Sequence, residues 1–175
     1  MKNTDDDSPL ILTLSLDEES QTFFDQLREQ YFPPERNHLQ AHLTLFHHLP
    51  GREKSDISAL LSETSQAHEP LRMEVDEVKM IGRGVAYRLK SERLVKLHRH
   101  MAREWKDWLT PQDQQKLWPH ITVQNKVNPA KARKLHAKLS ENFEPFSAYG
   151  TGLKLWAYQG GPWEWLQTFP FRSQV

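Results

Sequence analysis

Two stretches of the chain follow one pattern, His42-Leu43-Thr44-Leu45 and His120-Ile121-Thr122-Val123. Each stretch lies in an apolar run, which predicts a β-strand. Successive side chains of a strand point to opposite faces, so each histidine shares a face with the threonine two residues later. The aliphatic residues between them mark the face that turns into the core. The sequence therefore predicts two outward-facing histidine–threonine pairs, and the repetition suggests one shared cleft.

The surroundings of the motif repeat as well, which matters because a bare histidine-x-threonine triplet is weak evidence. The first half reads as strand, helix, motif strand, helix and strand, with the flanking elements at 10–16, 18–32, 55–65 and 71–80. The second half repeats this order at 85–89, 92–109, 129–143 and 153–158, and a last edge strand follows. We expect a loose tail over 1–9 and one domain over 10–175, with repeat halves at roughly 10–81 and 84–159.

Composition narrows the class of protein. The chain has 175 residues, 37% of them hydrophobic, with six tryptophans and eight phenylalanines, which is enough for the core of one globular unit. It has 23 basic and 23 acidic residues. Proteins that bind a long duplex usually have a basic excess, so neutrality favours a small nucleotide or an RNA end as the partner. There is no cysteine, which leaves no disulfide or thiolate chemistry.

The first residues of the chain resemble no targeting segment. Residues 1–7 are polar and acidic, and the apolar run after them is short and follows a proline. This pattern fits neither a signal peptide nor a membrane span. We expect a cytoplasmic monomer with no membrane partner.

The motifs and their flanks resemble a known family. The paired HxTx tetrapeptides, the segments 118–127 and 45–51, and the Gly-Gly-Pro-Trp stretch at 160–163 are similar to the 2H phosphoesterase superfamily. The bacterial branch described as 2′-5′ RNA ligase-like or cyclic phosphodiesterase is the nearest match. The resemblance spans almost the whole chain. It implies a bilobal α+β fold with a pseudo-twofold axis, antiparallel sheets flanked by helices, and both histidines in a central groove. No cofactor is expected.

The four motif residues fit metal-independent phosphodiester chemistry. Histidine can act as base or acid near neutral pH, because its ordinary pKa is about 6.5. We expect His42 and His120 to take these two roles in an order that the sequence leaves open. Thr44 and Thr122 would donate hydrogen bonds to the phosphoryl oxygens. A 2′,3′-cyclic phosphate suits this machinery, the resemblance favours a 2′-phosphate product, and the reverse reaction would be 2′-5′ ligation.

Residues near the motifs are candidates for substrate binding. Strand alternation places Phe46 and His48 on the His42 face and His47 on the opposite face. Lys126, together with Gln124, continues the His120 face. Further candidates are Trp156 and Tyr158 for stacking on a base, and Arg83 and Arg88 for phosphate. By default we expect the helix residues His98, His100 and His136 at the surface.

Two other functions remain open at this stage. A metallohydrolase could use His42, His47, His48 and His120, but adjacent strand residues point opposite ways and no cluster with metal-ligand spacing is evident, so we predict no metal site. A module that binds nucleotides or RNA ends without catalysis is the second alternative. Activity that survives exhaustive chelation would exclude the metallohydrolase, and turnover of a nucleoside 2′,3′-cyclic phosphate would exclude the non-catalytic module.

Overall fold

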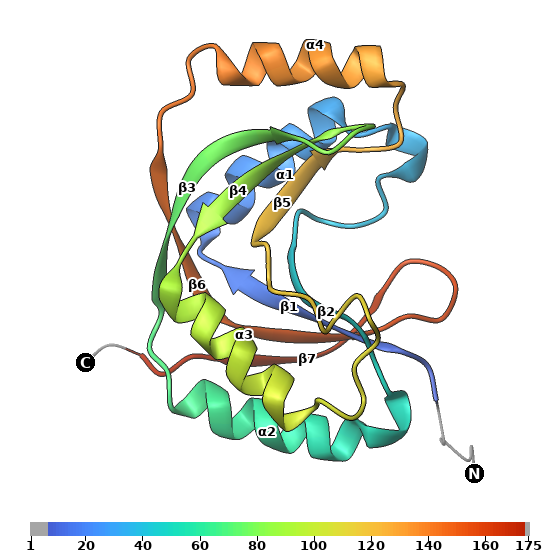
Figure 1. The fold of residues 1–175 in the computed structure, drawn as a ribbon, viewed down its shortest axis with the longest axis vertical. Coiled ribbons are helices and arrows are strands. Elements are labelled where there is room, and N and C mark those ends of the chain that lie inside the picture. Colours follow the sequence, from blue (N-terminus) through green and yellow to red (C-terminus); the bar gives the residue numbers. More distant parts are fainter. Residues whose placement is uncertain (1–6, 174–175) are drawn as a thin grey trace.

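Within residues 7–173, the part of the chain that the computed structural model describes, seven strands form one curled antiparallel sheet with four α-helices around it (Figure 1). The strands are β1 (Leu10–Leu16), β2 (Leu43–Leu49), β3 (Leu71–Met80), β4 (Val85–Lys90), β5 (His120–Gln124), β6 (Phe146–Ala157) and β7 (Glu164–Pro170). The α-helices are α1 (Glu18–Tyr31), α2 (Lys54–Gln66), α3 (Glu92–Glu104) and α4 (Pro129–Ser140), and short 3₁₀ turns occupy Pro34–Arg36 and Gly51–Glu53. The α+β class is confirmed.

The element order also matches the prediction, with three differences in length, of which the smallest is that the helix predicted over 129–143 ends at Ser140. The helix predicted over 92–109 ends at Glu104, and irregular turns follow it. The strand predicted over 153–158 begins already at Phe146. The sequence did not predict this part of β6 because it contains Gly150 and Gly152. Glycine is unfavourable in a strand unless another backbone approaches closely. At Gly152 a Cβ atom would lie 2.6 Å from the Phe169 carbonyl oxygen of β7. Residues 1–6 of the predicted tail lie outside the described residues.

The strand pairing has an internal symmetry. The sheet runs β2-β1-β6-β3-β4-β5, with β7 paired to β6. The order β2-β1-β6 therefore mirrors β5-β4-β3, and the two sets meet where β3 pairs with β6. The lobes that the sequence predicted are joined in one sheet. The two motif strands, β2 and β5, end this series of strands, and the curl of the sheet brings them into contact with each other.

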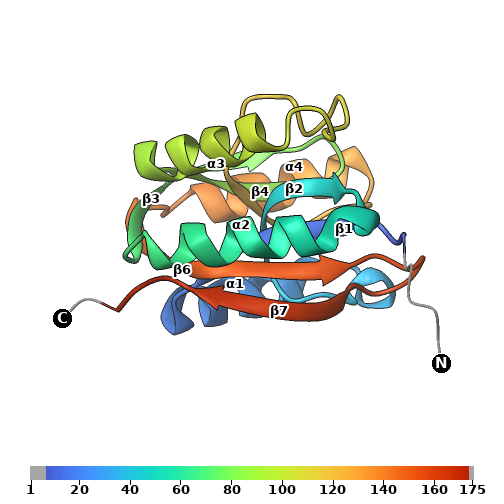
Figure 2. The same cartoon turned by 90° about the horizontal axis from the view of Figure 1, so that it is seen from below.

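The helices link the two sets of strands. Helix α1 packs against β5, α4 packs against β3 and β4, and α2 runs along the β6–β7 hairpin (Figure 2). Buried Arg28 on α1 donates from Nη1 to the carbonyl of Thr122 in β5 at 3.2 Å. In the other direction, Nε2 of His98 on α3 lies 3.1 Å from the carbonyl of Leu45 in β2. A helix from each half thus contacts the motif strand of the other half.

His98 lies in the interior of the protein and not at the surface where we expected it. We expected it at the helix surface, but it is 6% exposed and its ring stacks on Phe46 at 4.5 Å. The expectation was wrong because α3 lies against β2, so this side of the helix has no solvent. His136 also bonds inward, to the carbonyl of Val78 at 3.0 Å, whereas His100 is exposed as expected.

Strand β2 departs from regular alternation just after its motif. Thr44 pairs with Thr13 of β1, but the next paired residue is Phe46, opposite Leu12. The register thus skips Leu45, an irregularity of the β-bulge type that turns the following side chains by one position. Phe46 lies in the core with no exposed surface, and both His47 and His48 are exposed. Strand alternation therefore predicted the wrong direction for Phe46.

Candidate functional site

The two motif histidines are held in the same way by different parts of the chain. Nδ1 of His42 lies 2.8 Å from the carbonyl of Gln40, and Nδ1 of His120 lies 2.7 Å from the carbonyl of Trp118. Both partners are the backbone two residues earlier. A carbonyl oxygen only accepts, so Nδ1 must carry the hydrogen in each ring. In the neutral form this leaves the Nε2 lone pair of each histidine available as a base.

Burial keeps both rings uncharged in the free protein. The pKa of His42 is lowered to about 4, chiefly by desolvation and to a smaller extent by the charges of Arg28, His120 and His47, while the hydrogen bond to Gln40 opposes these effects. Desolvation also lowers the pKa of His120. The charge of His120 acts on His42, so the two motifs are electrostatically coupled. At neutral pH both histidines are therefore bases.

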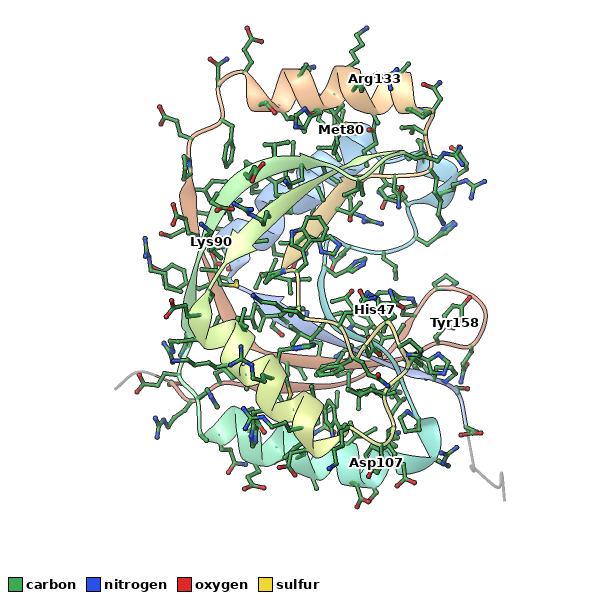
Figure 3. The ribbon with its side chains drawn as sticks, viewed as in Figure 1. His47, Met80, Lys90, Asp107, Arg133 and Tyr158 are labelled. Carbon is green, nitrogen blue, oxygen red and sulfur yellow. The ribbon has the colours of Figure 1, made fainter. Side chains whose placement is uncertain are left out.

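Residues of both motifs line one cavity of about 260 Å³, which includes Thr44 from β2 and His120 from β5. His47 also lines it, and Figure 3 shows this side chain near the middle of the molecule. The remaining lining residues are Leu45, His98, Gln112, Asp113, Gln115, Lys116, Leu117 and Trp118. Thr122 is half-buried, two residues after His120 on the same face of β5. The structure thus brings Thr44 and His120 together across the curl of the sheet.

A second cavity, of about 220 Å³, lies beside His42. Trp156, a candidate for stacking on a base, lines this cavity, and its indole Nε1 donates to the Thr13 hydroxyl at 2.9 Å. Lys154 and Trp163 line it as well, and the Trp163 ring lies 4.7 Å from that of His42. Sequence reasoning assigned no role to Trp163. Its place next to the Gly160-Gly161-Pro162 turn was the available signal.

Four other candidates lie away from these two cavities. Phe46 is in the core, so it is not available to a substrate. His48 is exposed and lines neither cavity. Lys126 follows the end of β5 in a left-handed backbone conformation, with φ of 62°, and is exposed. Tyr158 is 44% exposed just beyond β6, in the loop that leads to β7 (Figure 3).

The two arginine candidates are engaged elsewhere. Arg88 pairs with His120 in the β4–β5 register, but its guanidinium binds both carboxylate oxygens of Asp76, at 2.9 and 2.8 Å. Arg83 is exposed, and its Nε donates to the carbonyl of Val127. Gln124 is buried, and its Oε1 has no hydrogen-bond partner.

A wider groove, of about 990 Å³, adjoins the His120 cavity. One face of α3 and the segment before β5 form it, and Lys116, Leu117 and Trp118 line both spaces. Trp118 is 39% exposed and stacks on His120 with ring centroids 4.1 Å apart. The exposed cations of the groove that form no ion pair within residues 7–173 are Lys96, Arg99 and Lys116. We call this space the basic groove.

The described residues contain neither a metal-binding cluster nor a membrane-spanning helix. Within residues 7–173, no group of three or more histidine, cysteine, aspartate or glutamate side chains is placed to hold a metal ion. In the same range, no helix is both long and apolar enough to cross a membrane.

Comparisons with known proteins agree with this fold. The structure is similar to TT0787 of Thermus thermophilus, with a TM-score of 0.67 and 17% identity over 95% of this chain and 100% of that one. It is also similar to E. coli LigT in the apo form, with a TM-score of 0.63 and 18% identity over 96% of this chain and 99% of that one. A structure of E. coli LigT with 3′-AMP matches with a TM-score of 0.57 and 19% identity, covering 97% and 100% of the two chains.

At these identities the solved structures establish the fold alone. A search of curated proteins gave no match. The family model described as the 2′-5′ RNA ligase superfamily matches residues 16–162, a span that contains both motifs and all four α-helices. The protein therefore belongs to the 2′-5′ RNA ligase superfamily of 2H phosphoesterases.

Proposed function

We propose that the protein is a metal-independent phosphodiesterase of RNA ends, which opens a 2′,3′-cyclic phosphate or cleaves a 2′-5′ phosphodiester by acid–base catalysis between His42 and His120. The observation that carries this proposal is the matched pair of Nδ1 hydrogen bonds to backbone carbonyls, which leaves both Nε2 atoms free for proton transfer. The coupling between the two rings is the supporting observation.

The reaction needs one neutral and one protonated histidine. Nε2 of the neutral ring takes a proton from water, and the water oxygen forms a bond to phosphorus. The P–O3′ bond of the cyclic phosphate breaks, and the protonated ring gives its proton to O3′, which leaves a 2′-phosphate. Both rings are neutral in the free protein, so the phosphate anion must favour protonation of one of them as it binds. The same ring opening with a 5′-hydroxyl in place of water, and with O3′ again as the leaving group, forms a 2′-5′ linkage.

Neutral donors and one buried cation complete the proposed site. The hydroxyls of Thr44 and Thr122 donate to the non-bridging phosphoryl oxygens, where charge develops in the transition state. Arg28 holds the backbone of Thr122, and its charge is felt at His42. It forms hydrogen bonds to Asn37, Leu39 and Thr122, all through neutral oxygens. The Asp25 carboxylate lies near enough to act on this charge without a hydrogen bond to it, and the part of the charge that reaches His42 favours an anion beside that ring.

The basic groove favours an RNA end over a free nucleotide. It continues from the His120 cavity past Trp118, and its unpaired cations Lys96, Arg99 and Lys116 suit the phosphates of a chain that extends beyond the reacting nucleotide. Exposed Trp118 offers a stacking surface for a base. The solved E. coli LigT complexes contain 3′-AMP, ATP and phosphate, so that protein accommodates phosphate-bearing ligands.

The decisive experiment is turnover of a nucleoside 2′,3′-cyclic phosphate and of an oligoribonucleotide with the same terminus, each with and without exhaustive chelation. We expect a 2′-phosphate product, no effect of chelation, and a lower KM for the oligonucleotide. Binding without turnover would support the non-catalytic alternative. Activity that requires added metal would support the metallohydrolase. Either result would overturn the proposal.

The pH profile gives a second test. With both pKa values below the ordinary 6.5, the form with one proton on the pair is most populated on the acid side of 6.5. We therefore expect kcat/KM, which reports the free enzyme, to pass through a maximum below pH 6.5. A bound phosphate anion raises both pKa values, so the maximum of kcat should lie at higher pH. A flat profile from pH 4 to 8 would contradict the acid–base pair.

A further inference from the structure

A third histidine shares the cavity of Thr44 and His120. Strand alternation placed His47 on the face opposite His42, but the irregular register of β2 at Leu45 turns it into this cavity. Its side chain is 43% exposed. Neither proton transfer by His42 and His120 nor hydrogen bonding by the two threonines uses this side chain.

The partner of His47 is a buried carboxylate. The Asp113 side chain is 1% exposed, and it accepts hydrogen bonds from the backbone N–H groups of His47 and His48 at 2.9 to 3.0 Å. Its Oδ1 also lies 3.1 Å from the ring Nδ1 of His47. Burial raises the pKa of Asp113, but these bonds and the nearby His47 outweigh burial and hold the pKa below its ordinary value. Asp113 is therefore an ionised carboxylate with little access to water.

This carboxylate distinguishes His47 from the two motif histidines. The Nδ1 atoms of His42 and His120 face neutral carbonyls, whereas Nδ1 of His47 faces a charge. The backbone N–H groups stabilise the Asp113 carboxylate without cancelling its charge, and within residues 7–173 the side chain that forms an ion pair with it is His47. The hydrogen bond to Asp113 fixes the hydrogen on Nδ1 and leaves Nε2 as the free ring atom of His47.

We propose that His47, held by Asp113, binds the reacting phosphate as an imidazolium and donates from Nε2 to a non-bridging oxygen. This inference rests on the proposed function and adds a charged donor to it. The two threonines supply neutral hydrogen bonds, whereas the phosphoryl group gains negative charge in the transition state. Charge-assisted hydrogen bonds are roughly twice as strong as neutral ones. In the free protein the site then has a cation that contacts the phosphate, beside two neutral rings, one of which gains the proton for acid catalysis as the phosphate binds.

The charge of His47 also reaches its neighbours. It lowers the pKa of both His120 and His42, in each case as a smaller contribution than burial. The other charged or titratable groups that line the same cavity are Asp113, Lys116 and His98. Loss of the His47 charge should therefore raise the pKa values of the catalytic pair, an effect that a purely structural residue would not have.

The test compares His47→Gln with His48→Gln and Asp113→Asn. His48 is the matched control, because it is the next residue of β2, its backbone also bonds to Asp113, and its side chain is outside the cavity. We expect His47→Gln to lower kcat/KM for a cyclic phosphate by about 10 to 100-fold and to move the pH maximum upward. Asp113→Asn should change both quantities in the same direction, and His48→Gln should stay within about twofold of the unmodified protein.

A binding measurement separates this inference from the proposed function. The dissociation constant of inorganic phosphate, followed by NMR of the histidine rings, should rise about fivefold in His47→Gln, and phosphate should shift the His47 signals of the unmodified protein. This holds even if no cyclic phosphate is turned over, which would end the proposed function alone. Unchanged phosphate affinity, kcat/KM and pH profile in His47→Gln would overturn the inference. His47→Gln decides the matter if Asp113→Asn does not fold.

Discussion

The two halves of the site hold their motif histidines in the same way, but the residues that surround the two rings differ. On each side a histidine donates from Nδ1 to the carbonyl two residues earlier. Beyond that, His42 lies against Trp163 and a cavity with Lys154 and Trp156, whereas His120 lies against Trp118 and opens toward the basic groove. The shared hydrogen bonds match the chemistry that we propose, and we expect the different surroundings of the two rings to orient an asymmetric substrate.

The largest loss of activity should follow substitution of the two motif histidines, which both halves hold in the same way. We expect His42→Ala or His120→Ala to lower kcat by roughly 10²–10⁴-fold, because each ring moves a proton in the transition state. The double variant should lose much less than the product of the two losses, since the rings act as a unit. Steady-state kinetics on a cyclic phosphate measures this. If a variant is less stable but its folded molecules keep full specific activity, that histidine has a structural role and no catalytic one.

The threonines test whether the halves are equivalent in binding the phosphoryl group. Thr44→Val and Thr122→Val keep the side-chain shape and remove one donor each, so each should cost about 1–3 kcal/mol in kcat/KM. The melting temperature should stay nearly unchanged, because both side chains are only half-buried. Equal losses of kcat/KM in the two variants would indicate that both threonines contribute equally to binding the phosphoryl group. No loss at either position would remove the threonines from the mechanism.

Acid stability compares the two histidines directly. His42 has a pKa of about 4 in the folded protein, below its ordinary value of 6.5. Between these values the unfolded chain binds the proton more readily, so the free energy of unfolding should fall as the pH drops from 6.5 to 4, by on the order of 2 kcal/mol. This contribution is fully present above pH 6.5.

Denaturation of the two glutamine variants at several pH values checks this expectation. His42→Gln should flatten the pH dependence more than His120→Gln, because the charge of Arg28 adds to burial at His42. If both variants reduce the pH dependence of the free energy of unfolding equally, the two histidines are more alike in pKa than the structure indicates.

The smallest effect should come from the unshared basic groove. Lys96→Glu with Arg99→Glu should raise KM for an oligonucleotide by about 3 to 10-fold at low salt and leave the KM of a mononucleotide unchanged. The control is Lys131→Glu with Arg133→Glu on α4, at the far end of the molecule (Figure 3). Equal effects of the two double variants would mean that overall charge, and no specific groove, attracts RNA.

The sequence was sufficient for the fold class, because the repeated order of elements and the alternation around each motif were both visible. It also placed Trp156 beside the site. It failed at Phe46 and His47, since the irregular register at Leu45 has no signature in the apolar pattern of β2. It assigned no role to Asp113 or Trp163, because both belong to irregular segments that only the tertiary structure brings to the motifs.

His42 directly precedes β2 and His120 begins β5, and no single turn or helix joins these two strands to one another. Their separation is set by how strongly one sheet bends across β3 and β6. In β6, Gly152 allows an approach of β7 that any side chain would prevent. If the two histidines act as we propose, a substitution at this distant position should change the rate of proton transfer without contact to either imidazole. In that mechanism the curvature of the sheet is a geometric variable of the reaction, alongside the two histidines.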